Sequence, residues 1–188
     1  MNLFMVFIAQ HKGESVQITP EIDIDQATHA AIQQLRNESF PKHQVARSYY
    51  KQCPHLRLLA YDGDTLTGHL GLDYRRIRVG DSVLKVLGVI DFCVREQVRG
   101  TGIGSAMLTY LNQYAQSRAV DFIMLISEHE TFYRKHGFQN IAAQHHWLMI
   151  HEHQNFGIGH HWLNDLWVCS IQGAPWPDGE IDWLGYLY

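Results

Sequence analysis

The clearest pattern of apolar and polar positions lies in the middle of the chain. The apolar run from Val86 to Val94 predicts a buried strand, and a short polar turn with three glycines follows it. Apolar residues then recur at a helical period, which predicts a helix over Gly102–Ser117. These positions are Ile103, Ala106, Met107, Tyr110, Leu111 and Tyr114. The stretch therefore has the order strand, glycine loop, helix.

The residues before this stretch predict a strand, two helices and a set of antiparallel strands. Val16–Thr19 favours a short strand, and Glu21–Asn37 has helical spacing with Asp23 and Asp25 near its start, where the helix dipole favours acids. A less regular helix is predicted at Gln44–Lys51. Strands joined by tight turns at residues 62–64 and 80–81 are expected over Leu56–Tyr61, Leu66–Arg78 and Val83–Val94.

The residues after it predict further alternation. Phe122–Ile126 is a continuous apolar run typical of a buried strand. Ser127 and Glu130 have capping-box spacing for a helix over Thr131–His136 that ends at Gly137. Strands are then expected from Phe138, and at Trp147–His151, Leu166–Ile171 and Ile181–Tyr188, with a loop at Gln154–His161 and a turn at Pro175–Gly179.

This order predicts an α+β fold with a mixed, mostly antiparallel central sheet and helices on both faces. With 188 residues, we expect one domain over residues 1–188. Residues 1–15 are an arm or strand in this interpretation. The apolar run Leu3–Ala9 is too short to cross a bilayer and has neither a basic flank nor a cleavage site of a leader.

Composition and charge narrow the function classes. The net charge is −4 and no block of Lys or Arg occurs, which argues against a nucleic-acid surface and favours a cationic small molecule. Three scattered cysteines form neither a disulfide framework nor a metal-ligand spacing, and they fit a cytoplasmic location. The sequence leaves open whether the chain forms a homodimer.

The glycine loop suits an anion. Gly100, Gly102 and Gly104 let the backbone approach a ligand, helical N–H groups attract phosphate, and Arg99 adds a cation. The Walker loop is excluded because no lysine precedes Ser105, and the G-x-G-x-G spacing differs from the Rossmann fingerprint. Such turns also occur without any ligand, so the loop by itself leaves both interpretations open.

Two motifs together resemble a known family. Arg99-Gly-Thr-Gly-Ile-Gly104 is similar to the acyl-CoA loop of the Gcn5-related N-acetyltransferases, and Phe132-Tyr-Arg-Lys-His-Gly-Phe138 resembles their phenylalanine–tyrosine helix. The resemblance is best over Val83–Ile141. It implies that residues 83–141 form an acyl-CoA-binding core and that residues 142–188 supply strands and a loop on the substrate side.

The family resemblance also implies site residues. The diphosphate of acetyl-CoA would lie on the loop, its pantetheine arm would pair with the strand end, and the Val94 N–H would hold the oxyanion. The cofactor-binding candidates are thus Phe92, Cys93, Val94, Arg99, Gly100, Thr101, Gly102, Ile103 and Gly104.

The resemblance assigns Tyr133 as the acid that protonates the leaving thiolate, and a phenol is suited to this because its pKa is near that of a thiol. Tyr133 could otherwise be a packing aromatic. Asp91 interrupts an apolar run and is the candidate base or substrate ligand; the alternative is a structural hydrogen-bond acceptor.

The C-terminal region weakly resembles aminoglycoside 2′-N-acetyltransferases and nodulation N-acyltransferases. That likeness makes Glu180, Asp182 and Trp183 substrate candidates, together with Glu38. The alternative is a closing strand with solvated acids and a core tryptophan. The histidine pairs between His145 and His161 match no zinc spacing, so no metal is expected.

These observations predict an acetyl-CoA-dependent N-acetyltransferase that acts on a primary amine of a small cationic substrate, such as an aminoglycoside-like amino sugar. Two alternatives stay open: a non-catalytic acyl-CoA-binding module, and an N-acyltransferase for a longer acyl chain.

Overall fold

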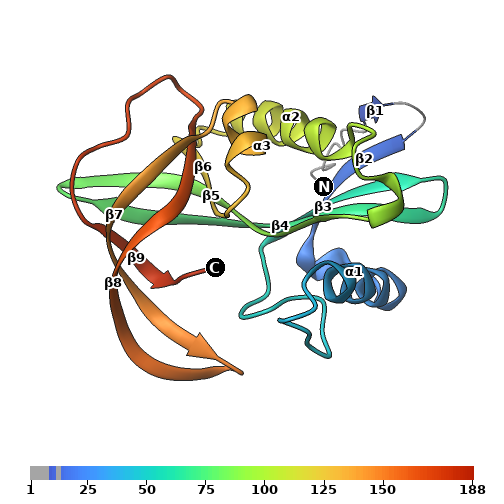
Figure 1. Ribbon diagram of the computed structural model, residues 1–188, viewed down its shortest axis with the longest axis horizontal. Coiled ribbons are helices and arrows are strands. Elements are labelled where there is room, and N and C mark those ends of the chain that lie inside the picture. The colour runs from blue at the N-terminus through green and yellow to red at the C-terminus, as the bar shows by residue number, and fades with distance from the viewer. Residues whose placement is uncertain (1–8, 12–13) are drawn as a thin grey trace, which may run out of the picture. The chain divides into compact units, whose positions relative to one another are not determined.

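The computed structural model describes residues 9–11 and 14–188. The chain divides into two compact units (Figure 1). Unit 1 holds the residues up to Leu72 and Ile90–Leu111, and unit 2 holds Asp73–Val89 and Asn112–Tyr188. The predicted N-terminal arm lies outside the described residues, except for the part that begins at Ala9. The single-domain interpretation of residues 1–188 remains a prediction.

Unit 1 contains an antiparallel sheet. Its strands follow the order β1-β2-β3-β4; β1 pairs with the start of β2, at Glu14–Val16, and β2 pairs with β3 from Glu14 to Pro20. The strands are β1 (Ala9–His11), β2 (Glu14–Pro20), β3 (Leu56–Asp62) and the first part of β4 (Thr65–Val79). The end of β5 (Ser82–Val94) also belongs to this unit.

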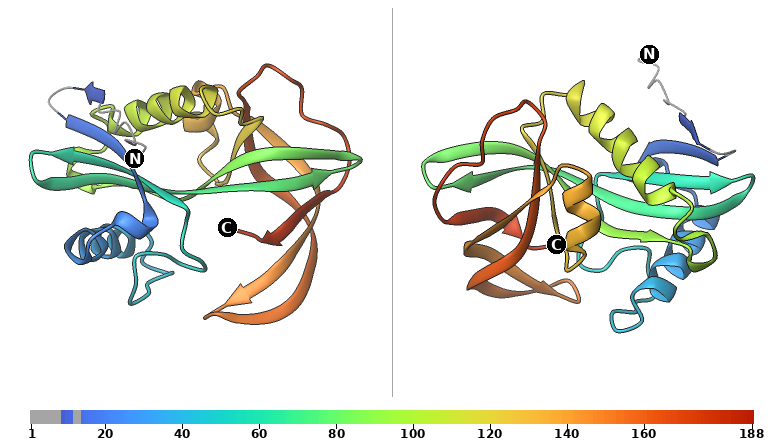
Figure 2. Two further views of the ribbon diagram at one scale, coloured as in Figure 1. Left: turned by 180° about the vertical axis from the view of Figure 1, so that it is seen from behind. Right: turned by 45° about the horizontal axis from the view of Figure 1, so that its top comes forward.

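Two helices cover opposite faces of this sheet (Figures 1 and 2). Helix α1 (Gln26–Ser39) packs its Leu35 in a cluster with Leu59 of β3. Helix α2 (Ile103–Gln116) lies against the other face, where its Met107 covers Gly68, which pairs with Ala60. Successive residues of a strand point to opposite faces, so Leu59 and Ala60 contact different helices.

Helix α1 starts later than predicted. Glu21–Asp23 forms one turn of 3-10 helix, η1, and α1 begins at Gln26. The Asp25 carboxylate accepts a hydrogen bond of 2.7 Å from the Thr28 N–H and therefore caps α1. This bond lowers the pKa of Asp25. The acids thus precede the helix instead of lying inside it.

The predicted helix at Gln44–Lys51 is wrong: this segment is irregular. Its carbonyl groups accept hydrogen bonds from side chains instead of from a helical backbone. Asn37 donates to the Val45 carbonyl at 2.8 Å, and Arg57 donates to the Ser48 carbonyl at 2.9 Å. These side chains supply the hydrogen-bond donors that helical N–H groups would otherwise give to the two carbonyls, so the segment can be irregular without leaving them unpaired.

In unit 2 the strands close on themselves. The order is β4-β5-β6-β8-β7-β9, and β9 returns to pair with β4 at Arg78 and Val79. Among the described residues this makes a six-stranded barrel with parallel pairs at β5–β6 and β7–β9. The strands after β5 are β6 (Phe122–Ile126), β7 (Gln139–His151), β8 (Gln154–Ser170) and β9 (Ile181–Tyr186).

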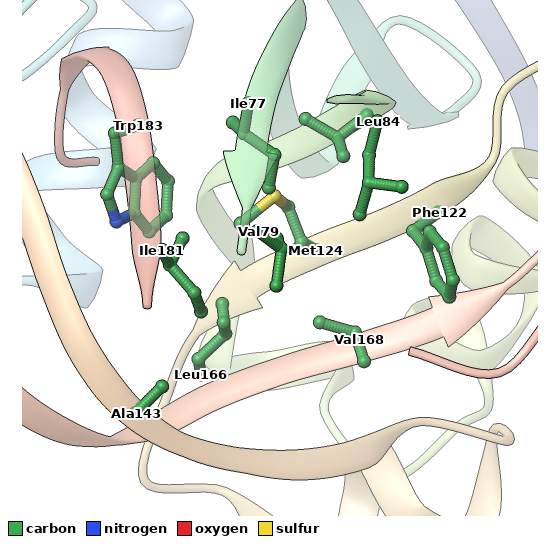
Figure 3. Packing of buried hydrophobic residues seen from close by; sticks show 11 residues of the cluster. Ile77, Val79, Leu84, Phe122, Met124, Ala143, Leu166, Val168, Ile181 and Trp183 are labelled. Carbon is green, nitrogen blue, oxygen red and sulfur yellow. The ribbon is translucent and has the colours of Figure 1, made fainter. Parts of the chain in front are cut away.

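The interior of this barrel is apolar (Figure 3). Leu166 and Val168 of β8 face Met124 of β6, and Trp183 of β9 is fully buried among the same side chains. Burying the side chains of six strands on one another removes apolar surface from water, and this stabilises the unit. The α+β class with a mixed, mostly antiparallel sheet is confirmed.

Two predictions for unit 2 are wrong. The loop expected at Gln154–His161 is the first half of β8, which pairs with β7 across a tight turn where Glu152 and His153 have φ of 46° and 59°. Gly157 and Gly159 are residues that seldom occur inside strands, so the sequence pattern favoured a loop here. Gly159 leaves room for the Trp147 ring, since a Cβ at this position would lie 2.6 Å from that ring.

The capping box is also absent. Helix α3 (Glu130–Lys135) has His129 as its N-cap, and the Ser127 hydroxyl instead accepts from the His129 N–H at 3.1 Å. Gly137, with φ of 80°, follows the C-cap His136 as predicted. No helix in the described part of the chain is long and apolar enough to cross a bilayer.

Candidate active site

The glycine loop lies in unit 1, between β5 and α2. After Val94 the chain makes one 3-10 turn, η2 (Glu96–Val98), and enters the loop at Arg99. Gly100 and Gly102 have φ of 79° and 107°, which L residues rarely adopt. A Cβ at Gly100 would meet no atom within 4 Å. Glycine is therefore favoured at this position by the positive φ and not by a lack of space for a side chain.

The loop ends at the start of α2. The first helical hydrogen bond runs from the Ala106 N–H to the Gly102 carbonyl at 2.9 Å. The N–H groups of Ile103 and Gly104 precede it and have no acceptor inside the helix. With the positive end of the helix dipole, this geometry suits an anionic ligand. The Arg99 Nε donates to the Val94 carbonyl at 2.9 Å, which fixes this exposed side chain beside the end of β5.

Asp91 lies in β5 with an unusual backbone, φ of 51°, and a defined partner. Its carboxylate accepts a hydrogen bond of 2.8 Å from Arg36 of α1 and forms an ion pair with that guanidinium. Arg36 is only 1% exposed and also donates to the His43 carbonyl at 2.7 Å. The Phe40 and Tyr50 rings lie 5.7 and 5.3 Å from its guanidinium carbon.

Arg36 is the residue of this site that the sequence analysis missed. It follows Ile32 by four positions, so it falls on the buried face of α1. A buried cation needs an anionic partner, and Asp91 is an acid inside an otherwise apolar strand. The helical spacing of Arg36, taken together with this isolated acid, could have predicted the pair.

Cys93 and Glu38 are also in unit 1. Burial raises the pKa of the Cys93 thiol to about 12, so this thiol is protonated at neutral pH and only its backbone suits a ligand. The Glu38 carboxylate is exposed; it accepts from Gln34 at 2.8 Å and lies 3.9 Å from the Arg95 guanidinium.

Tyr133 lies in unit 2, on α3, and is buried. Its ring stacks on Trp167 with centroids 6.3 Å apart and meets Phe138 edge-on at 5.6 Å. Burial raises the pKa of the Tyr133 phenol to about 12, although a hydrogen bond with the Ser127 side chain opposes the increase. The phenol is therefore protonated at neutral pH and carries a proton that it could donate.

The C-terminal candidates lie in or beside β9 in three different environments. Glu180 is exposed and its carboxylate lies 2.8 Å from His146 Nε2. Asp182 accepts from the Leu184 N–H at 2.9 Å and thereby stabilises a turn. Trp183 is fully buried, and its indole N–H donates to His145 Nδ1 at 3.0 Å. In this conformation Trp183 is a core residue and presents no surface to a ligand.

Unit 2 also contains a buried ion pair that the sequence did not indicate. Arg75 donates to Asp73 through Nε at 2.7 Å and to the Tyr186 carbonyl at 2.7 Å. Its guanidinium carbon lies 4.3 Å from the Tyr186 ring and 4.9 Å from the Tyr188 ring. A Cβ at Gly88 would lie 1.7 Å from the Tyr188 hydroxyl, so the absent side chain at Gly88 makes room for that phenol.

The comparisons with known proteins decide the family. A family model described as an acetyltransferase (GNAT) domain matches residues 19–141. The chain belongs to this family. The match includes both motifs, the glycine loop before α2 and the tyrosine of α3, and it ends near the start of β7. A comparison with curated proteins found no match.

Solved GNAT structures have the same fold. A GNAT family acetyltransferase from Brucella melitensis, in complex with acetyl-CoA, is 16% identical with a TM-score of 0.57, over 88% of this chain and 94% of that one. An aminoglycoside 6′-N-acetyltransferase complexed with coenzyme A is 16% identical with a TM-score of 0.56, over 86% and 99% of the two chains.

A GCN5-related N-acetyltransferase from Kribbella flavida is 14% identical with a TM-score of 0.54, over 68% of this chain. This chain spans 34% of the length of that larger GNAT protein.

Proposed function

We propose that this chain transfers an acetyl group from acetyl-CoA to a primary amine of a small cationic molecule. The observation that carries the proposal is the match to the acetyltransferase family over residues 19–141, with the glycine loop, in which Gly100 and Gly102 have positive φ, and Tyr133 both inside it. Coenzyme A or acetyl-CoA in two structures of the same fold supports the donor. Three free cysteines fit a reducing, cytoplasmic location.

The residues of unit 1 would hold the donor. The N–H groups from Arg99 to Gly104 would bind the diphosphate, and the guanidinium of Arg99 would add a charge-assisted contact. Phe92 and Cys93 would offer backbone groups to the pantetheine arm. The Val94 N–H would donate to the oxyanion that forms when the amine attacks the thioester carbonyl.

The reaction balances without another reactant. The amine nitrogen forms the new bond to the acetyl carbon and loses one proton, and the carbon–sulfur bond breaks. The sulfur leaves with the electron pair and gains one proton. A phenol with a pKa of about 12 is a weaker acid than a thiol. Tyr133 would therefore stabilise the thiolate by hydrogen-bond donation while it forms.

Asp91 is the proposed base or amine ligand, and it would act while paired with Arg36. The Arg36 guanidinium compensates the carboxylate charge and accounts for one of its two oxygens, Oδ2. The other oxygen could accept a proton from the amine or from a bridging water. Glu38, Glu180 and Asp182 are the proposed contacts for further positive groups of the acceptor, and the aminoglycoside 6′-N-acetyltransferase with this fold supports an amino-sugar acceptor.

The test is thiol release from acetyl-CoA with a panel of amines that includes aminoglycosides. We expect release with at least one amine, and a loss of kcat of about 10²-fold or more in Tyr133→Phe. The exposed Tyr74→Phe is the matched control and should retain activity. If no amine gives thiol release, the enzymatic function is refuted.

Binding separates the remaining alternatives. Tight CoA binding without turnover would indicate an acyl-CoA-binding module, and stronger competition by long-chain acyl-CoA than by acetyl-CoA would indicate a longer acyl donor. Gly102→Glu should abolish CoA binding in a calorimetric titration, because its carboxylate would face the phosphates. Gly63→Glu, also at a positive φ but in the β3–β4 turn, is the control.

A further inference from the structure

Ser127 connects the end of β6 with the start of α3. Its N–H donates to the Asp165 carbonyl at 3.0 Å, and its own carbonyl accepts from the Trp167 indole at 2.8 Å. Both partners belong to β8, which pairs with β6 up to Ile126. These two hydrogen bonds hold the Ser127 backbone against β8, so its side chain starts from a fixed point beside α3.

The Ser127 hydroxyl lies beside the residue that the proposed function needs as a proton donor. It accepts from the His129 N–H at 3.1 Å, and the His129 carbonyl accepts from the Tyr133 N–H at 3.3 Å. His129, the N-cap of α3, therefore joins the serine side chain to the tyrosine backbone. The phenol of Tyr133 completes the group through its hydrogen bond with the Ser127 side chain.

Trp167 supports both members of this pair. Its indole N–H holds the Ser127 carbonyl, and its ring lies against the Tyr133 ring with the two planes 29° apart. Phe138 contacts the same tyrosine ring edge-on, and Tyr133 is buried. Because one rigid side chain supports both residues, the two hydroxyl groups keep a constant relative position, as a catalytic group requires.

The available donors determine which way the hydroxyl protons point. A backbone N–H can only donate, so the Ser127 oxygen is the acceptor toward His129 and its own proton remains for another group. Donation of this proton to the Tyr133 oxygen stabilises the phenolate, and the bond lowers the pKa that burial raises. A phenol oxygen that accepts this bond must direct its own proton elsewhere.

We propose that Ser127 is a positioning residue for Tyr133: its hydroxyl donates to the phenolic oxygen, so that the phenol proton points away from Ser127 and is available to the departing sulfur. This inference rests on the proposed acetyl transfer. Accepting one hydrogen bond also makes the phenol a stronger donor in the next, because bonds in a chain polarise one another. Ser127 itself does not contact the donor or the amine.

Steady-state kinetics with acetyl-CoA and an accepted amine test this role. Ser127→Ala should lower kcat about tenfold and leave the KM for acetyl-CoA unchanged, while Ser127→Thr, which keeps the hydroxyl, should retain most of the activity. In a Tyr133→Phe background, Ser127→Ala should cause no further loss, because the phenol through which it acts is absent. A purely structural serine would lower kcat by the same factor in both backgrounds, and that result would overturn the proposal.

A second measurement needs no enzymatic activity. A fluorinated tyrosine at position 133 titrates at lower pH than tyrosine, and its fluorine NMR signal reports its charge. Ser127→Ala should raise the pKa of this phenol by about 1. The control is Ser170→Ala, which removes a serine hydroxyl that donates to the Ala174 carbonyl at 2.7 Å and should leave that pKa unchanged. Circular dichroism shows whether each variant is folded. Absence of thiol release with every amine would refute the enzymatic function alone, whereas an unchanged phenol pKa in Ser127→Ala would overturn the positioning role.

Discussion

His145 provides a prediction that follows from one hydrogen bond. Its Nδ1 accepts from the Trp183 indole at 3.0 Å, and an indole N–H is only a donor. Nδ1 must therefore be unprotonated, and the neutral ring carries its proton on Nε2. Burial, with a smaller contribution from the charge on His146, lowers the pKa of His145 from 6.5 to about 4.

The shift predicts a loss of stability in acid. Between pH 6.5 and about 4 the unfolded chain protonates this histidine and the folded chain does not, so the free energy of unfolding falls as pH falls. The full difference is about 3 kcal/mol, and about 2.5 kcal/mol of it should be lost by pH 4.5. The contribution is fully present above pH 6.5.

The measurement is urea-induced unfolding at pH 7 and pH 4.5, at one protein concentration. His145→Asn keeps an acceptor for Trp183 but does not titrate, so its stability should fall less than that of the wild type by about 2.5 kcal/mol. The exposed His151→Asn, at the end of β7, should behave like the wild type. Equal pH dependence of wild type and His145→Asn would refute the reasoning.

Three further variants test other contacts. Arg36→Met should lower the free energy of unfolding by about 3 kcal/mol, because it leaves the Asp91 carboxylate without its counterion, and Arg36→Met with Asp91→Asn should recover part of the loss in a double-mutant cycle. Gly88→Ala should destabilise by about 1–3 kcal/mol through overlap with the Tyr188 phenol, and adding Tyr188→Ala should relieve that overlap, measured by thermal unfolding. Gly100→Ala should cost only about 1 kcal/mol, from backbone strain, since its Cβ would meet no atom.

Local signals predicted the elements whose chemistry lies in one stretch of sequence. The periodic residues of α2, the continuous apolar run of β6 and the glycine after α3 each determine their own element. Prediction of secondary structure failed where contacts with residues far away in the sequence determine the conformation. The carbonyls of 44–51 bond to Arg57 and Asn37, and β8 forms a strand despite its glycines because β7 lies beside it and the Trp147 ring covers Gly159.

For the site, the sequence identified the candidate functional residues, but it did not identify the residues that contact them. The loop from Arg99 to Gly104 and Tyr133 were identifiable from motifs. The environment of Trp183 was not, because its burial results from the closure of β9 between β7 and β4. Strand neighbours in a closed barrel are separated by many residues, so no local pattern specifies them.

Asp91 shows how a partner changes the interpretation of a residue. An acid within an apolar strand must be solvated, protonated or paired, and Arg36 pairs it. The pair also joins α1 to the positive-φ position of β5, directly before the backbone groups proposed to hold the acyl chain. If Asp91 acts as a base, Asp91→Asn should remove an acidic limb from the pH profile of kcat/KM, whereas a purely structural acid should lower kcat/KM by a similar factor at every pH. Arg36→Lys keeps the positive charge beside Asp91 but loses the fixed guanidinium geometry. It should therefore lower the free energy of unfolding while the acidic limb of the pH profile is retained.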